Sequence, residues 1–290
     1  MVLAGVRLTA ACVFGFGCVV AALVVYQTWV SDPARLKEAV KSVPLRQIVF
    51  STDGVLERAW LDQTLALPRN ASLMALDLTA LEKRLLESGQ AQSVVLRRRF
   101  TDNALEVAVH ERVPVARLMV QSGDSAPQLR LVAPDGVVYE GTGYDQATLE
   151  QLPWLDGIAL RRTARGGLEP IAGMERVANL LRSAQALVPR LYASWQVVSL
   201  ARLGADNEII VRSRDVPEII FDAGRGFPRQ LAKLDYIVDS IRTHGNPPVA
   251  RIDFSVGSQV PVELQAAGSA KSDRYTLSSA TSQPRQRRDF

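Results

Sequence analysis

The sequence predicts an α+β protein with a single transmembrane helix at its N-terminus. Leu8 to Tyr26 is an uncharged, almost wholly apolar run, and no other run in the chain compares with it. The 290-residue chain leaves enough length beyond this run for two ordinary domains, each with a core of its own. In that remainder, segments with period-two hydrophobicity are interspersed with segments of helical period. We therefore expect one anchor that carries one large globular portion.

The apolar run has the length of a membrane span. At ~1.5 Å rise per residue, a helix from Leu8 to Tyr26 covers nearly the ~30 Å hydrocarbon core of a bilayer. Tyr26 and Trp29 stand at its end, where aromatic rings favour the headgroup zone. We expect a cytoplasmic N-terminus at residues 1–7 and an anchor at residues 8–29. The anchor residues include Leu8, Phe14, Phe16, Val20, Leu23 and Tyr26.

Two other interpretations of this run are weaker. A cleaved signal peptide has a shorter apolar region and a small-x-small cleavage site, and residues 26–30 offer no such site. A buried core helix is rarely so free of polar positions. The run therefore predicts an uncleaved anchor.

Orientation follows from two observations that disagree. Only Arg7 precedes the run, whereas four basic residues follow it, namely Arg35, Lys37, Lys41 and Arg46. This count of positive charges would place the large portion in the cytoplasm. Long domains, however, are exported largely regardless of such charge. The only cysteines, Cys12 and Cys18, lie inside the run, which suits an oxidising exterior for the rest of the chain. We expect the large portion outside the cytoplasm.

The net charge of +4 does not indicate nucleic-acid binding. Residues 266–290 contribute +3 of it, which leaves +1 for the whole of residues 1–265. No basic domain is left to bind phosphates. The tail is rich in Ser, Gln, Ala and Arg, so we expect residues 266–290 to be disordered.

After a polar spacer at residues 30–44, the chain reads as strand, helix, helix, strand, strand. Asp77 stands where it would cap the second helix. In the last strand Leu105, Val107 and Val109 alternate with polar or small residues, as in a half-buried strand. The expected elements are Leu45–Ser51, Leu56–Leu65, Leu78–Leu86, Val94–Leu96 and Leu105–Val109.

The second part is expected to be rich in β-strands, with two helices. A hairpin at Leu131–Tyr139 contains Asp-Gly near its turn. Apolar residues at helical spacing predict helices at Met174–Leu187 and from about Phe227 to Ile241. The expected strands are Val197–Leu200, Ile209–Arg212, Glu218–Phe221 and Arg251–Ser255.

The sequence contains no catalytic motif. It has no G-x-S-x-G, H-E-x-x-H or P-loop, and its two histidines, His110 and His244, stand in a predicted strand and a predicted loop. The residues 224–226 (Gly-Arg-Gly) could present amide groups to an anion, but a helix entry is the better interpretation. We expect no catalysis, no metal and no cofactor.

The last predicted strands suggest a protein-binding edge. From Arg251 to Leu264 every even-numbered residue except Ser258 is apolar, which predicts two arms whose even positions face the core around a turn at 257–258. Pro261 would be tolerated at a sheet edge with its missing N–H facing outward. A partner strand could add there, although the proline could instead serve to protect the edge from aggregation. The candidate binding residues are Arg251, Asp253, Ser255, Ser258, Gln259, Val260, Pro261, Val262, Glu263 and Leu264.

Several motifs resemble those of the bacterial division proteins FtsQ and DivIB. The strand–helix–helix–strand–strand order after one anchor is similar to their POTRA domain, and residues 111–116 (E-R-V-P-V-A) match the family pattern E-R-x-P-V-A. In the pattern V-x-R-x-x-W-P-x-x-L, Phe100 replaces Trp and Thr101 replaces Pro, and Gly89-Gln90 replaces a usual Pro-Trp pair. Residues 131–139, 152–157 and 251–255 are similar to three later family segments, with Ser255 in place of the usual Arg.

The resemblance implies a POTRA-like domain at 45–117 and an FtsQ-type β domain at 118–265. It implies a non-enzymatic scaffold that crosses the bacterial inner membrane once and works at the division septum, with its C-terminal portion periplasmic. Its partners would be other bitopic division proteins (FtsB/FtsL-like), bound by strand addition at the C-terminal edge, and it would help control septal peptidoglycan synthesis. The alternatives are a POTRA-bearing component of polypeptide export or outer-membrane assembly, and a membrane-anchored hydrolase.

Overall fold

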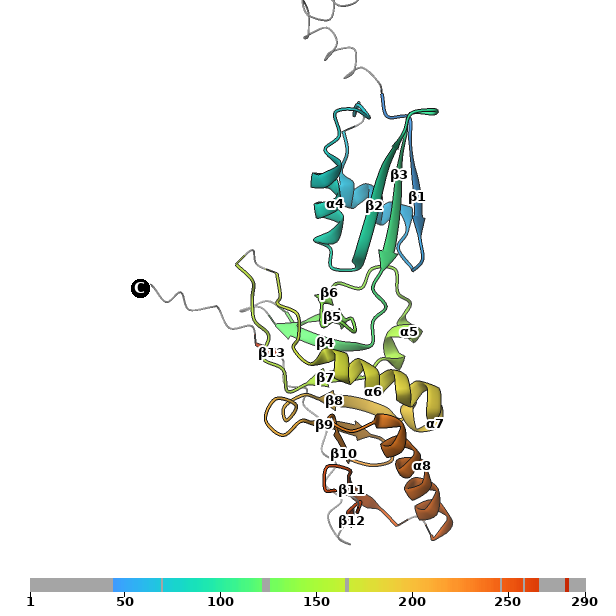
Figure 1. Cartoon of the computed structure of the whole chain (residues 1–290), viewed down its shortest axis with the longest axis vertical. Coiled ribbons are helices and arrows are strands. Elements are labelled where there is room, and N and C mark those ends of the chain that lie inside the picture. The colour runs from blue at the N-terminus through green and yellow to red at the C-terminus, as the bar shows by residue number, and fades with distance from the viewer. Residues whose placement is uncertain are drawn as a thin grey trace, which may run out of the picture.

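The computed structural model describes residues 44–68, 70–121, 126–164, 167–245, 247–257 and 259–265, together with Ala280 and Thr281. Within these residues the chain is α+β, with a three-stranded and a ten-stranded sheet that are both mixed. The smaller sheet and its two helices form a first unit (residues 44–115) at one end of the molecule (Figure 1). The larger sheet forms a second unit, which begins at residue 116.

The first unit has the expected order of elements. They are β1 (Gln47–Thr52), α3 (Arg58–Leu65), α4 (Leu78–Leu86), β2 (Ala91–Arg99) and β3 (Ala104–Glu111). The strand order is β1-β3-β2; β1 runs parallel to the central β3, and β2 runs antiparallel to it. The carboxylate of Asp77 accepts a hydrogen bond of 3.1 Å from the Ala80 amide, so it caps α4 as the sequence predicts.

The period-two pattern of β3 sets the core of this unit. Leu105, Val107 and Val109 are buried on one face of the sheet and pack in one cluster with Leu81 and Leu85 of α4. The predicted face of this strand is therefore confirmed. Burial of these branched apolar side chains between the sheet and the helices stabilises the first unit.

The second unit is built on the ten-stranded sheet. Its order is β12-β11-β10-β9-β8-β7-β4-β5-β6, and β13 pairs with β4 outside this path. The strands are β4 (Ala116–Gln121), β5 (Gln128–Val132), β6 (Val138–Tyr139), β7 (Trp154–Asp156), β8 (Trp195–Ser199), β9 (Glu208–Ser213), β10 (Glu218–Asp222), β11 (Val249–Asp253), β12 (Val262–Leu264) and β13 (Ala280–Thr281).

Two long helices cover one face of this sheet. They are α6 (Met174–Leu187) and α8 (Phe227–Thr243), which pack against each other along the sheet (Figure 1). Their buried residues recur at helical spacing and share one large cluster with alternate residues of the strands. Helix α8 begins with Phe227-Pro228 directly after Gly226, so residues 224–226 form the helix entry that the sequence favours.

The predicted fold class is wrong in its number of helices and in its transmembrane helix. The second unit has four described helices, whereas two were expected. The two additional helices are α5 (Gln146–Gln151), which buries no side chain, and α7 (Pro189–Tyr192), which is a single turn. They were not predicted because neither has a hydrophobic period. In the described part of the chain, no helix combines the length and the apolar character that a membrane span requires. The predicted anchor residues, Leu8, Phe14, Phe16, Val20, Leu23 and Tyr26, lie outside the described residues.

The two units are joined through the buried side chain of Gln90. Its Nε2 donates to the Thr142 carbonyl at 2.9 Å and to Glu111 Oε2 at 3.1 Å, while the Thr142 amide donates to its Oε1 at 2.9 Å. Glu111 Oε1 in turn accepts from the Leu56 amide at 2.8 Å and from the Thr52 hydroxyl. Because these buried polar groups satisfy one another, the junction is a fixed connection.

Arg112 reinforces the same junction. Its Nη1 donates to the carbonyl oxygens of Gly89 at 2.8 Å and Ala91 at 2.7 Å, and its Nε donates to Asp135 of the second unit at 2.9 Å. Its own carbonyl accepts the hydroxyl groups of Tyr139 and Tyr144, each at 3.1 Å. Residues 111–112, the start of the E-R-V-P-V-A segment, therefore bind the two sheets together.

Candidate protein-binding site

Strand β12 forms one edge of the large sheet. It pairs antiparallel with β11, and β11 pairs parallel with β10, so β12 ends the strand order. Among the residues that the structure describes, no strand lies on the outer side of β12. The edge is therefore open to a further strand.

The register shows which backbone groups of β12 face outward. The Asp253 amide donates to the Pro261 carbonyl at 3.1 Å, and the Gln265 amide donates to the Pro248 carbonyl at 2.8 Å. In an antiparallel ladder, residues alternate between hydrogen-bonded and non-bonded pairs. Val262, which pairs with Ile252, and Leu264, which pairs with Val249, therefore direct their N–H and C=O groups away from β11.

Apolar side chains accompany this open backbone. Val262 is 38% exposed, Leu264 is 58% exposed, and Val256 in the preceding loop is 55% exposed. The three residues form what we call the β12 apolar edge. Exposed apolar side chains beside unpaired backbone groups are what a strand-addition site requires.

The expectation that all even-numbered residues from 252 to 264 face the core is wrong. Ile252 and Phe254 are buried, but the residues of the β12 apolar edge are exposed. Val262 lies on the same face as its partner Ile252, but it stands in the edge strand and does not belong to the hydrophobic cluster that contains Ile252. A register shift between Val249 and Arg251 adds to the difference.

Pro261 is also oriented differently from the prediction. Its carbonyl accepts from the Asp253 amide, so its backbone polar groups point toward β11, and the missing N–H lies on the inner side of the edge. It stands immediately before β12 and not within it. The proline therefore removes no outward-facing donor from β12.

The polar residues predicted on this edge are bound to one another. Arg251 Nη2 donates to Asp253 Oδ2 at 2.8 Å, and Asp253 Oδ1 accepts the Ser255 amide at 2.8 Å and the Ser255 hydroxyl at 2.6 Å. Burial opposes ionisation of Asp253, but the hydrogen bonds from Ser255 and Arg251 outweigh it, so the pKa of this carboxyl lies below its usual value. The hydrogen bond to Asp253 likewise raises the pKa of Arg251. These three residues fix the start of the loop.

The remaining predicted residues are divided between surface and core. Gln259 and Glu263 are exposed, and Glu263 pairs with Arg251 across the ladder. Val260 is half-buried and packs against the large cluster. Ser258 lies outside the described residues. Arg225 donates to the Gly257 carbonyl at 2.8 Å and so ties the loop before β12 to the start of α8.

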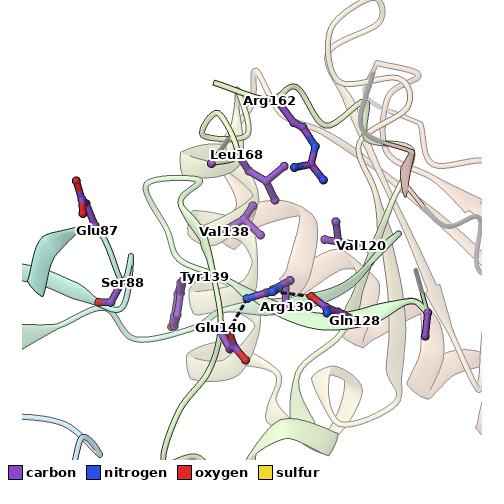
Figure 2. Close-up of a pocket in the computed structure, with 12 residues that line it drawn as sticks. Glu87, Ser88, Val120, Gln128, Arg130, Val138, Tyr139, Glu140, Arg162 and Leu168 are labelled. Carbon is purple, nitrogen blue, oxygen red and sulfur yellow. Dashed lines mark hydrogen bonds and ion pairs between the residues drawn. The ribbon is translucent and has the colours of Figure 1, made fainter. Parts of the chain in front are cut away.

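A polar cavity lies at the other end of the sheet, beside the junction. Its volume is about 410 Å³, and Figure 2 shows residues that line it, among them Glu87 and Ser88 of the first unit and Arg130 and Tyr139 of the second. Arg130 in this cavity donates to Glu140 at 2.9 Å and to Gln128 at 2.6 Å. Since its charge is already neutralised, Arg130 does not mark an anion site.

The chemistry open to the described residues depends on their metal-ligating side chains and on the surroundings of the two histidines. Within the ranges that the structure covers, no group of three or more His, Cys, Asp and Glu residues could hold a metal ion. His110 pairs with Asp53 at an exposed position, and His244 bonds the Ser240 carbonyl at the end of α8. The arrangement as a whole is suited to binding through a strand edge.

Sequence reasoning missed the junction residues Gln90 and Glu111. One signal was present: Glu111 continues the buried phase of Leu105, Val107 and Val109, which predicts a carboxylate inside the structure. No pattern marks Gln90, because its partner Thr142 lies 52 positions further along the chain.

The chain was also compared with known proteins. Neither the protein-family models nor the curated proteins give a match.

Proposed function

We propose that this chain is a non-enzymatic scaffold that binds a partner protein by adding a partner strand to β12. One observation carries the proposal: β12 ends the sheet, and its residues Val262 and Leu264 present both backbone groups and apolar side chains outward. Main-chain hydrogen bonds would supply affinity, and neighbouring side chains would supply specificity.

The fixed junction supports a scaffold. Gln90, Glu111 and Arg112 hold the two units through buried or half-buried hydrogen bonds, so a ligand on one unit is held at a defined position relative to the other. A protein that positions partners needs this property more than it needs mobility.

The biological role that we propose rests on the resemblance to FtsQ and DivIB. Residues 111–116 and the strand–helix–helix–strand–strand order carry that resemblance. The role is recruitment of single-span division proteins (FtsB/FtsL-like) and control of septal peptidoglycan synthesis, at the inner membrane, with residues 45–265 on the periplasmic side. The membrane placement rests on the apolar sequence of residues 8–29 alone.

Two experiments test the proposal. A fluorescent fusion of the full chain should gather at midcell, whereas an even peripheral distribution would favour a role in export or outer-membrane assembly. A chain ended after Ala267 should still co-purify with its partners, and one ended after Val256, which lacks β12, should not. If partners co-purify equally with the shorter form while it remains folded, the binding surface lies elsewhere.

A further inference from the structure

A second cavity, of about 390 Å³, lies on the sheet face opposite α6 and α8. Arg117 of β4, Trp154 of β7 and Val197 of β8 stand opposite one another in three adjacent strands. Their neighbours Leu118, Leu155 and Val198 belong to the cluster that packs on the two helices, so these three side chains point to the other face. The wall is completed by Glu150, Leu152, Ala193 and Arg214, with Trp195 and Gln196.

Within the part of the chain that the structure describes, Arg117 of this cavity forms no ion pair with a carboxylate. Its guanidinium lies over the Trp154 ring, 4.3 Å from the ring centre. Among the described residues, Arg117 makes one weak polar contact, a 3.5 Å hydrogen bond from Nη2 to the Glu150 carbonyl, at the limit for such a bond, and its buried Nε has no partner there. Burial lowers the pKa of Arg117, and the nearby charge of Glu150 opposes this effect only in part.

The two other charged residues of the wall do not satisfy Arg117. The Glu150 carboxylate accepts from the Gln146 amide group at 2.9 Å, and Arg214 Nη2 donates to the Ala193 carbonyl at 2.7 Å. The lining therefore carries two cations and one anion. Arg130 in the cavity of Figure 2 differs from Arg117, because it forms an ion pair with the Glu140 carboxylate.

The chemistry of the cavity selects a class of ligand. A guanidinium presents a planar fork of donors that matches a carboxylate, and this pairing is stronger where apolar walls limit water. Trp154, Leu152 and Val197 supply such walls. The two arginines and Glu150 give the lining a formal charge of +1, which one carboxylate neutralises. A doubly charged phosphate would exceed this charge and would be repelled by the Glu150 carboxylate.

We propose that this cavity binds a carboxylate group of a polypeptide, either an Asp or Glu side chain or a free chain terminus. Four strands, β8 to β11, separate β7 from β12, so this site is distinct from the β12 apolar edge. The inference does not depend on the proposed function, because a substitution in β12 leaves the residues of the Arg117 cavity unchanged. The chain would thereby contact polypeptide at two separate places on one sheet.

The test uses the full chain and its indole N–H resonances. The chain has four tryptophans, so the Trp154 signal can be assigned with a Trp154→Phe variant. The probes are acetyl-Gly-Asp-Gly-amide, its Asn counterpart, acetyl-triglycine with a free carboxylate, and inorganic phosphate. We expect the two carboxylate probes to shift the Trp154 signal in a saturable way, and the larger shift identifies side chain or chain terminus as the preferred source.

Variants of opposite sign decide the assignment. Arg117→Gln should weaken binding of the carboxylate probe roughly tenfold or more, because it removes a charge-assisted pair. Glu150→Gln at an exposed position should strengthen binding, and Arg190→Gln on the exposed surface of α7 should leave it unchanged. Equal shifts with the Asp and Asn peptides, tighter binding of phosphate, or no response to Glu150→Gln would overturn the proposal, even if Arg117→Gln fails to fold.

Discussion

The side chain of Gln90 and the main chain of Thr142 exchange two hydrogen bonds, each 2.9 Å long, across the junction between the two units. A side-chain amide that donates to the C=O and accepts from the N–H of one residue pairs with it as a neighbouring strand would. The same side chain reaches Glu111 at 3.1 Å, so one residue connects β3 with the loop before α5. The two sheets should consequently unfold together.

Gln90→Ala tests this coupling. The change removes the hydrogen bonds that Gln90 makes to the Thr142 main chain and to Glu111 Oε2, which should lower the free energy of unfolding by about 1–3 kcal/mol. Denaturant unfolding of the full chain measures the effect. The matched control is Gln92→Ala at an exposed position of β2, which should change stability little. Equal effects of the two changes would show that the junction is not held by Gln90.

The core of the first unit is tested by neighbouring residues of β3. Val107 is 1% exposed, so Val107→Ala should cost about 1–3 kcal/mol of unfolding free energy. Glu106 on the opposite face pairs with Arg99 at 2.7 Å in a partly exposed ion pair, and Glu106→Ala should cost about 0–1 kcal/mol. The two stabilities are compared in denaturant, and similar losses would mean that the face is assigned wrongly.

The loop before β12 should respond to pH through Asp253. Its pKa is depressed in the folded state, so its contribution to stability is present above the ordinary carboxyl value of about 4 and is lost as the pH falls through the folded-state pKa. Asp253→Asn should therefore be destabilising near neutral pH. The difference from the unchanged chain should shrink in acid, as measured by thermal unfolding across pH 2 to pH 7. A difference that does not vary with pH would exclude this role.

Local patterns predicted the elements that have a long hydrophobic period. Asp77 and the spacing of Leu78, Leu81 and Leu85 placed α4 at its observed bounds, and the alternation in β3 gave its buried face. The short elements were not predicted: α5 buries nothing, and β7 is three residues long. Periodicity needs more residues than these elements contain.

The candidate site was predicted in place but not in detail. The edge position of β12 was predicted from Pro261, although the structure turns the missing N–H of this proline inward, and the exposure of Val262 and Leu264 was not predicted. The cavity at Arg117 was not predicted, because parallel pairing brings Trp154 beside it from a distant part of the chain. Such pairings are set by tertiary structure and leave no local signal.

The proposed localisation makes a separate prediction. A reporter that is active only in the periplasm should work when it is fused after Leu264, because residues 45–265 are proposed to lie on the periplasmic side. The same fusion with a reporter that is active only in the cytoplasm should be inactive. The reverse pair of results would place residues 45–265 in the cytoplasm.

Leu264→Pro tests strand addition at β12 most directly. Leu264 turns its N–H away from β11, so proline there removes an outward donor and spares the internal ladder. Leu264→Ala is the matched control, since it shortens the same exposed side chain and keeps the donor. The measurement is the affinity of each folded variant for the co-purified partner. Strand addition predicts that Leu264→Pro binds roughly tenfold or more weakly than Leu264→Ala, because a main-chain hydrogen bond is lost and a buried acceptor is left unpaired. Equal affinities of the two variants, at unchanged unfolding free energy, would contradict it.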